Sequence, residues 1–118
     1  MPKNKVVLVS FPYDDHSVSK LRPAVCLTDP IGSHKHVILA FITSKPPTEV
    51  LESDFIIDSK SDDFKTTGLH VTSTVRLHRL TTVTAHLIKR ELGNISLRME
   101  LEVNRKICVL FNVNSNQS

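Results

Sequence analysis

A cation beside a proline and a hydroxyl at the end of an apolar run are the residues with the clearest capacity for chemistry. Arg22 opens the apolar segment 21–28, and Thr43 follows the apolar segment 36–42. If these segments pair as neighbouring β-strands, the guanidinium and the hydroxyl lie at one rim of a sheet. A guanidinium binds phosphate through two hydrogen bonds, and a hydroxyl donates one more. An ion-paired surface arginine and an ordinary strand-end threonine are the simpler interpretation from composition alone.

Further basic and hydroxyl side chains can line a cationic groove around this pair. They stand just before Arg22, just after Thr43 and in the alternating segment 73–80, and they are Lys20, Ser44, Lys45, Arg76, His78 and Arg79. The chain has a formal net charge of +3 and a pI near 9.0, a mild bias towards polyanions such as RNA, DNA or an acidic partner. A solvated strand face explains the same residues equally well.

Candidates for proton transfer and metal binding are few. His16 follows Asp14 and Asp15 in a polar loop, and an imidazole titrates near neutrality, although an ordinary turn has the same composition. His34 and His36 form a His-x-His pattern, but no acidic or Cys residue stands at ligand spacing nearby. The chain also lacks a Gly-rich phosphate loop and a paired-Cys cluster. We therefore predict no metal site and no cofactor.

The composition is that of one globular domain. The 118 residues are 40% hydrophobic and 23% charged, which favours a single folded domain over 1–118 with a frayed tail at 113–118. Cys26 and Cys108 both stand in apolar segments, and two buried free thiols suit a reducing cytosol. No apolar run has the length of a signal peptide or a membrane span. These features predict a cytoplasmic protein without a membrane segment.

Strand patterns dominate the first four-fifths of the chain. Runs of β-branched or alternating residues predict strands at 6–11, 21–28, 37–42, 54–58 and 73–80. The segment 86–92 fits either a strand or a helix by pattern, and we favour a strand that ends at Gly93. The run at 37–42 is continuously apolar, which predicts burial on both faces. The polar, mixed-charge segment 59–68 is predicted as an exposed loop.

After Gly93 the hydrophobic period changes to that of a helix, predicted over 96–111 with Asn94 or Ser96 as its cap. The apolar residues predicted to face the core are Leu97, Leu101, Cys108 and Phe111, flanked by Val103 and Ile107. Several strands followed by one amphipathic helix predict a mainly β, α+β fold: a small barrel or curled sheet closed by that helix.

Five segments of the chain, in order, resemble the MazF/PemK-like toxins of bacterial type II toxin–antitoxin pairs. They are residues 7–13, residues 19–24 with the Arg-Pro pair, residues 42–44, Gly68-Leu69 with Ser73 and Arg76, and residues 92–96. No single segment is specific, but the five together extend the resemblance from about Val6 to Phe111. The resemblance implies an SH3-like barrel of the kind shared with the gyrase poison CcdB. It also implies a homodimer, a cognate antitoxin and metal-independent cleavage of single-stranded RNA.

The resemblance also implies roles for particular residues. The family's arginine before proline matches Arg22, and its threonine after the third strand matches Thr43. Arg22 would stabilise phosphoryl charge and Thr43 would donate a further hydrogen bond, while the RNA supplies its 2′-hydroxyl as nucleophile. Ser17 replaces an acidic residue that some members carry five positions before the arginine, and Asn4-Lys5 replaces an opening Gly-Asp. The general base therefore stays open, with His16 or an aspartate of the same loop as candidates.

Two alternatives belong to other functional classes. The first is a CcdB-like, non-catalytic gyrase inhibitor, but that interaction relies on a C-terminal tryptophan and this chain has no tryptophan. The second is an inactive barrel that only binds RNA or protein.

Overall fold

β-branched and alternating segments form the sheet of this protein, and the late helical period forms its one long helix. The computed structural model describes residues 2–11 and 20–113. In that part of the chain the elements are β1 (Lys5–Phe11), β2 (Lys20–Cys26), β3 (His36–Thr43), β4 (Asp54–Ile57), β5 (Ser73–Thr84), β6 (Ile88–Asn94) and α1 (Leu97–Leu110). Short 3₁₀ helices occur at η1 (Phe64–Thr67) and η2 (Ala85–Leu87). The predicted mainly β fold with one C-terminal helix is confirmed.

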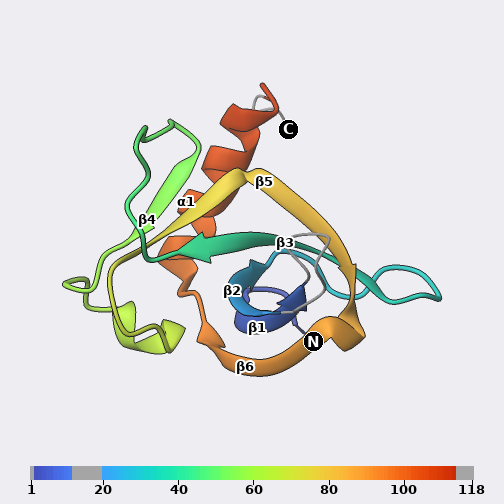
Figure 1. Ribbon diagram of the computed structural model, residues 1–118. Coiled ribbons are helices and arrows are strands. Elements are labelled where there is room, and N and C mark those ends of the chain that lie inside the picture. The colour runs from blue at the N-terminus through green and yellow to red at the C-terminus, as the bar shows by residue number, and fades with distance from the viewer. Residues whose placement is uncertain (1, 12–19, 114–118) are drawn as a thin grey trace.

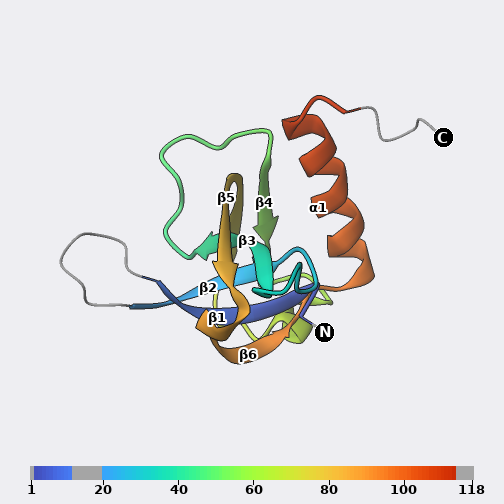
Figure 2. The same ribbon diagram turned by 90° about the vertical axis from the view of Figure 1, so that its right-hand side faces the viewer.

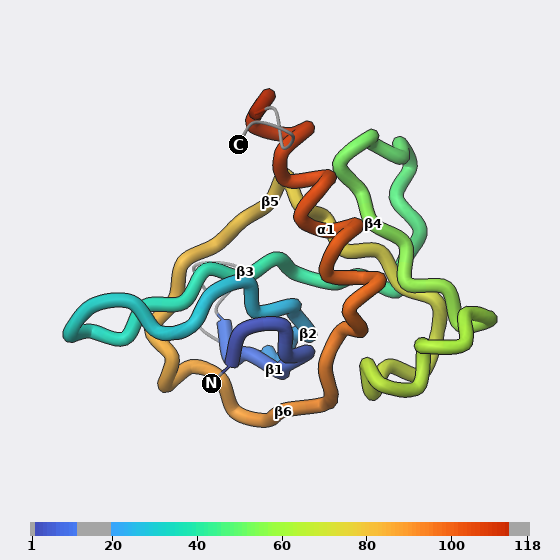
Figure 3. The backbone as a smooth tube through the Cα atoms, turned by 180° about the vertical axis from the view of Figure 1, so that it is seen from behind, coloured from blue at the N-terminus to red at the C-terminus, as the bar shows by residue number. Residues whose placement is uncertain are grey.

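The six strands form one antiparallel sheet in the order β4-β5-β3-β2-β1-β6. The sheet is strongly curled, so that β5 arches over β3 while β6 passes beneath β1 and β2 (Figure 1). Figure 2 shows α1 standing along one side of the molecule, next to β4. Seen from behind, α1 runs beside β4 and crosses in front of β5, and its last turn points away from the sheet (Figure 3).

Period-two alternation divides the buried side chains between the two faces of the sheet. One cluster lies under α1 and includes Val6 and Val25, which are opposite each other in the β1–β2 ladder. The other cluster includes their neighbours Val7 and Ala24. β3 contributes to both, as residues 37 and 39 join one cluster and 40 and 42 the other. The predicted burial of this strand on both faces is confirmed.

The predicted buried face of the helix is wrong in its central row and right in its flank. Leu97, Leu101 and Phe111 are 70%, 61% and 58% exposed, whereas the flanking Val103 is fully buried against the sheet together with Met99. The reason is that α1 has apolar residues on two faces, and the hydrophobic period does not say which of them meets the sheet. We call the outer row Leu97, Leu101, Cys108 and Phe111 the outer helix stripe.

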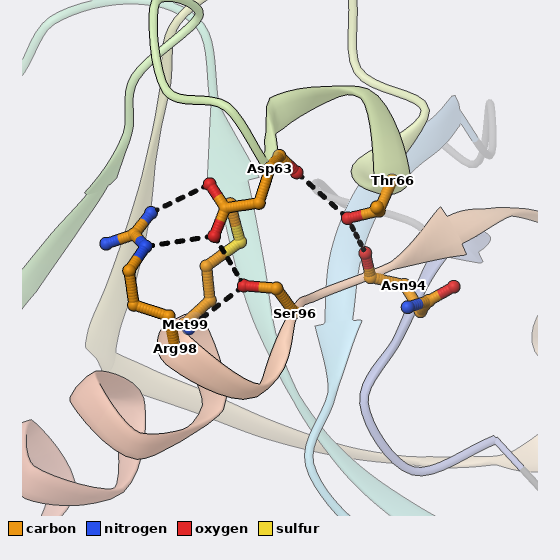
Figure 4. A network of polar contacts seen from close by, with 6 residues as sticks. All are labelled: Asp63, Thr66, Asn94, Ser96, Arg98 and Met99. Carbon is orange, nitrogen blue, oxygen red and sulfur yellow. Dashed lines mark hydrogen bonds and ion pairs between the residues drawn. The ribbon is translucent and has the colours of Figure 1, made fainter.

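The segment 59–68, predicted as an exposed loop, is instead tied to the start of α1. Asp63 accepts hydrogen bonds from the Arg98 guanidinium, at 2.9 Å to each carboxylate oxygen, and from Ser96 Oγ at 2.6 Å. Ser96 is the helix cap, accepting from the Met99 N–H at 3.2 Å. Thr66 adds a bond to the Asn94 carbonyl at 3.0 Å (Figure 4). These bonds order the segment because they satisfy its polar groups within the fold.

Glycine is required where this segment passes β6. Gly68 ends η1 with φ of +73°, a left-handed conformation that favours glycine. A Cβ on Gly68 would also collide with the Leu92 carbonyl, and one on Gly93 would collide with the Thr66 carbonyl. The two glycines thus let η1 pack directly on the β6 backbone. This packing fixes the position at which the segment from η1 to β5 begins.

Candidate functional site

The ladder between β2 and β3 brings Arg22 and Thr43 together. Its last paired residues are Ala24 and Phe41, and each step along one strand is matched by a step back along the other. Two more steps place Arg22 opposite Thr43, just beyond the paired region. Both residues line one open cavity of about 660 Å³. The predicted neighbourhood of the two strand ends is therefore what the register produces.

The cavity wall comes from four parts of the chain. They are Arg22 and Pro23 of β2, residues 41–48 at the end of β3 and beyond, residues 69–73 except Thr72, and Arg76 with Arg79 of β5. Four of these side chains carry a positive charge, namely Arg22, Lys45, Arg76 and Arg79, and no Asp or Glu is among the described residues that line the cavity. Such a concave cationic surface concentrates polyanions.

A large bulge in β5 positions two of these cations. Between the paired positions Ile42–Val75 and Ala40–Leu80, β3 has only Phe41, whereas β5 has the four residues 76–79. Leu77 is fully buried and anchors the bulge in the core. A bulge re-aims the side chains around it, and here Arg76 and Arg79 both reach the cavity wall. In a regular strand, Arg76 and His78 would instead have pointed to the same face of the sheet.

Arg76 is less exposed than its predicted place in an outward-facing groove implied. Its Nε lies 2.8 Å from Asp54 Oδ1, and the Asp54 side chain has no exposed surface. The two atoms form an ion pair, but their geometry does not meet the criteria for a hydrogen bond. The other carboxylate oxygen accepts from the Leu51 N–H at 2.8 Å. Arg76 is thus held at the cavity wall by a buried carboxylate, which offsets part of its charge.

The Thr43 hydroxyl closes a tight turn at the end of β3. It accepts from the Lys45 N–H at 3.1 Å and donates to the Lys45 carbonyl at 3.4 Å. The donated bond is long and therefore weak, so the hydroxyl hydrogen can be redirected to a ligand in the cavity. The turn also fixes Ser44 and Lys45 on the same wall.

Some predicted site residues lie elsewhere. Lys20 begins β2 and His78 lies in the β5 bulge, both exposed, and neither lines the cavity. His16 falls outside the described residues. Conversely, His70 lines the cavity and was not predicted. Its position between Gly68-Leu69 and Ser73, inside one of the family-like segments, was the available signal.

The two cysteines differ in exposure. Cys26 is buried as predicted and Cys108 is half-buried on the helix. Burial raises the pKa of the Cys26 thiol, whose Sγ donates to the Thr28 carbonyl at 3.2 Å. Within residues 2–11 and 20–113, no three His, Cys, Asp or Glu side chains gather as a metal site would require. No helix in that same part of the chain is long and apolar enough to cross a membrane.

A curled antiparallel sheet, one C-terminal helix and this cavity place the chain in the class of MazF-like folds. Residues 3–111 match the sequence profile of the family described as PemK-like, MazF-like toxin of type II toxin–antitoxin system. The chain therefore belongs to the PemK/MazF-like toxin family. A sequence comparison with curated proteins finds no match.

Solved structures show the same fold. Mycobacterium tuberculosis toxin MazF-mt6 is 19% identical with a TM-score of 0.70, over 93% of this chain and 98% of that one. A mycobacterial endoribonuclease in complex with its cognate antitoxin is 12% identical with a TM-score of 0.69, over 95% of each chain. MazE–MazF from Deinococcus radiodurans is 14% identical with a TM-score of 0.67, over 97% of each chain. At these identities the likeness shows the fold alone.

Proposed function

We propose that this protein is the toxin of a type II toxin–antitoxin pair and cleaves single-stranded RNA, messenger RNA included, without a metal ion. The observation that carries the proposal is the cavity where Arg22 and Thr43, at neighbouring strand ends, are joined by three further cations and no described carboxylate. Such a surface attracts a phosphate backbone. Family membership supports the reaction class, because structures of this fold include endoribonucleases. The proposed substrate implies action in the cytoplasm.

The proposed reaction uses the nucleophile that RNA already carries. The 2′-hydroxyl oxygen attacks the adjacent phosphorus, the bond from phosphorus to the 5′-oxygen breaks, and the products end in a 2′,3′-cyclic phosphate and a 5′-hydroxyl. Arg22 stabilises the additional negative charge on the phosphoryl oxygens, and the Thr43 hydroxyl donates to one of them. Ser44, Lys45, Arg76 and Arg79 bind the backbone along the wall, while Lys20 and His78 extend the contact beyond it.

The same charge gives the proposed antitoxin its means of inhibition. An acidic segment that is disordered when free can fold along the cationic cavity and cover Arg22 and Thr43. Its affinity is then expected to fall with added salt, because the contacts are partly exposed ion pairs. One structure of similar fold is an endoribonuclease in complex with its cognate antitoxin, which supports a partner of this kind.

A homodimer is the proposed assembly, and the outer helix stripe is its proposed contact. Leu97, Leu101 and Phe111 expose apolar surface along one side of α1. Contiguous exposed apolar surface on a soluble protein marks an interaction site. In a two-fold dimer, the outer helix stripe of one copy would pack against the same stripe of the second copy, so that one interface would bury both stripes.

The test is cleavage of one labelled single-stranded RNA by purified protein free of antitoxin. Cleavage is expected to persist in EDTA and to leave a 2′,3′-cyclic phosphate and a 5′-hydroxyl. Replacing the nucleotide upstream of the cut by its 2′-deoxy form is expected to abolish cleavage, because the attacking group is gone. DNA of the same sequence is expected to stay intact.

Three outcomes would contradict the proposal. Loss of activity in EDTA together with cleavage of the deoxy substrate would identify a metal-activated water as the nucleophile. Intact RNA together with gyrase trapped on DNA would identify a gyrase inhibitor. Binding without cleavage across a long, varied RNA panel would identify an inactive barrel that only binds RNA.

A further inference from the structure

The proposed cleavage needs a group that accepts the 2′-hydroxyl proton, and the described wall of the cavity has few acceptors. Its charged side chains are arginines and one lysine, which offer donors and no acceptor lone pair when protonated. Its Ser and Thr hydroxyls are much weaker bases than an imidazole or a carboxylate. No Asp or Glu is among the described residues that line it. The described wall is thus rich in donors and poor in bases.

His70 is the exception on this wall. It is exposed, on the segment between η1 and β5. The neutral imidazole of a histidine carries a free lone pair on one ring nitrogen, which can accept a proton. Among the described residues that line the cavity, His70 is the imidazole and the group suited to accept a proton.

The backbone on both sides of His70 is anchored. On one side the Leu69 N–H donates to Thr67 Oγ1 at 3.2 Å, and Thr67 is completely buried. On the other side Thr72 Oγ1 accepts from the Ser59 N–H and donates to Ser59 Oγ, both at 2.9 Å. The imidazole is therefore carried by a segment that the fold holds beside the cavity, as a base requires.

We propose that His70 is the general base of this protein, a role that rests on the RNA cleavage proposed above. The neutral imidazole takes the proton of the 2′-hydroxyl as the bond from the 2′-oxygen to phosphorus forms. The bond from phosphorus to the 5′-oxygen breaks, and the departing oxygen takes a proton from water. Arg22 neutralises the phosphoryl oxygens in the same step, so the charge stabiliser comes from β2 and the base from the segment between η1 and β5.

The experiment compares the pH dependence of kcat/KM for the wild type and His70→Gln on a single RNA substrate. The wild type is expected to lose activity on the acidic side of its pH profile, because a protonated imidazole has no lone pair to accept the 2′-hydroxyl proton. His70→Gln is expected to cleave roughly 10²- to 10⁴-fold more slowly and to lack that acidic limb. His70→Ala is expected to regain activity in proportion to added imidazole. His34→Gln, an exposed histidine in the turn before β3, is the matched control and is expected to behave as wild type.

The outcomes separate this proposal from the function on which it rests. Wild-type cleavage with an unchanged rate and acidic limb in His70→Gln would overturn the role of His70 and leave the proposed function standing. Loss of the limb in His16→Gln but not in His70→Gln would assign the base to His16 instead. A wild type that cleaves no RNA would overturn the proposed function and this role together. Thermal unfolding of each variant at wild-type temperature excludes misfolding as the cause of a rate loss.

Discussion

Asp54 and Arg76 face each other at the end of the β4–β5 ladder and form an ion pair of 2.8 Å between core and cavity. The aspartate side chain is fully buried, while the arginine keeps 22% of its side-chain surface exposed. One carboxylate thus holds a cation of the cavity wall and, through its second oxygen, the Leu51 backbone. This ion pair therefore contributes both to the stability of the fold and to the charge of the cavity wall.

We predict that Asp54→Asn lowers the free energy of unfolding by about 3 kcal/mol, because it leaves a partly buried guanidinium without its counter-charge. Urea denaturation measures this loss. Adding Arg76→Gln is expected to recover part of it, and strictly additive losses would contradict the coupling. Glu102→Gln is the control, since it breaks the exposed pair with Arg105 and is expected to change the free energy of unfolding far less than Asp54→Asn does.

Arg22→Ala is expected to slow RNA cleavage by roughly 10²- to 10³-fold, the usual cost of removing a donor to developing charge. Thr43→Ala is expected to cost about tenfold, the value of one neutral hydrogen bond, and Thr43→Ser is expected to keep most activity. Both alanine variants are expected to fold, because the two residues lie at strand ends outside the core. Growth after induction and the cleavage rate of a labelled RNA measure the effects. Full toxicity of both folded variants would remove the pair from the mechanism.

The lowered pKa of Asp63 predicts that the protein loses stability in acid. Hydrogen bonds from Arg98 and then Ser96 lower the pKa of Asp63 from 3.8 to about 2. Between these values the unfolded chain binds a proton that the folded protein does not, so this stabilisation is complete above pH of about 4 and is lost as pH falls towards 2. Asp63→Asn is expected to cost roughly 1 kcal/mol at neutral pH, because Arg98 is largely exposed.

Unfolding curves from pH 2 to pH 7 test this prediction. The difference between wild type and Asp63→Asn is expected to shrink as pH falls through that window. The exposed neighbour variant Asp62→Asn is expected to follow the wild type throughout. A constant difference at every pH would show that Asp63 acts through packing rather than through its charge.

The outer helix stripe predicts the effect of a charge on assembly. Leu101→Glu is expected to convert a dimer to a monomer, because an ionised carboxylate in an apolar contact is costly. Sedimentation velocity over a range of concentrations measures the change. Lys60→Glu, an exposed charge in the segment after β4, is expected to leave the assembly unchanged. A monomeric wild type, or a dimeric Leu101→Glu, would place the contact elsewhere.

The sheet was largely predictable, because β-branched alternation marks a strand without reference to its partners. The boundaries were less so. Residues 86 and 87 were expected in the last strand but lie in η2, and β5 continues to Thr84 instead of ending at residue 80. The buried face of α1 was not predictable, since Leu97 and Met99 are both apolar and tertiary packing decides which of them meets the sheet.

The candidate site was predictable in part, for a related reason. Arg22 and Thr43 stand at the ends of two consecutive strands, and antiparallel pairing of such strands brings those ends together. The directions of the Arg79 and His78 side chains depend on the β5 bulge. The bulge interrupts the regular alternation from which the face of a strand residue is predicted. His70 stands in no regular element, so only the path of the chain from η1 to β5 brings it to the cavity.

Pro46 and Pro47 give one wall of the cavity a low conformational entropy before any ligand arrives. Each ring fixes its own φ, and Pro46 also restricts Lys45 to extended backbone. A wall that is already ordered loses little freedom on binding, so more of the contact energy with the proposed RNA or antitoxin segment would appear as affinity. The two prolines are thus expected to strengthen that proposed binding through the unbound state of the protein, without a contact of their own with the ligand.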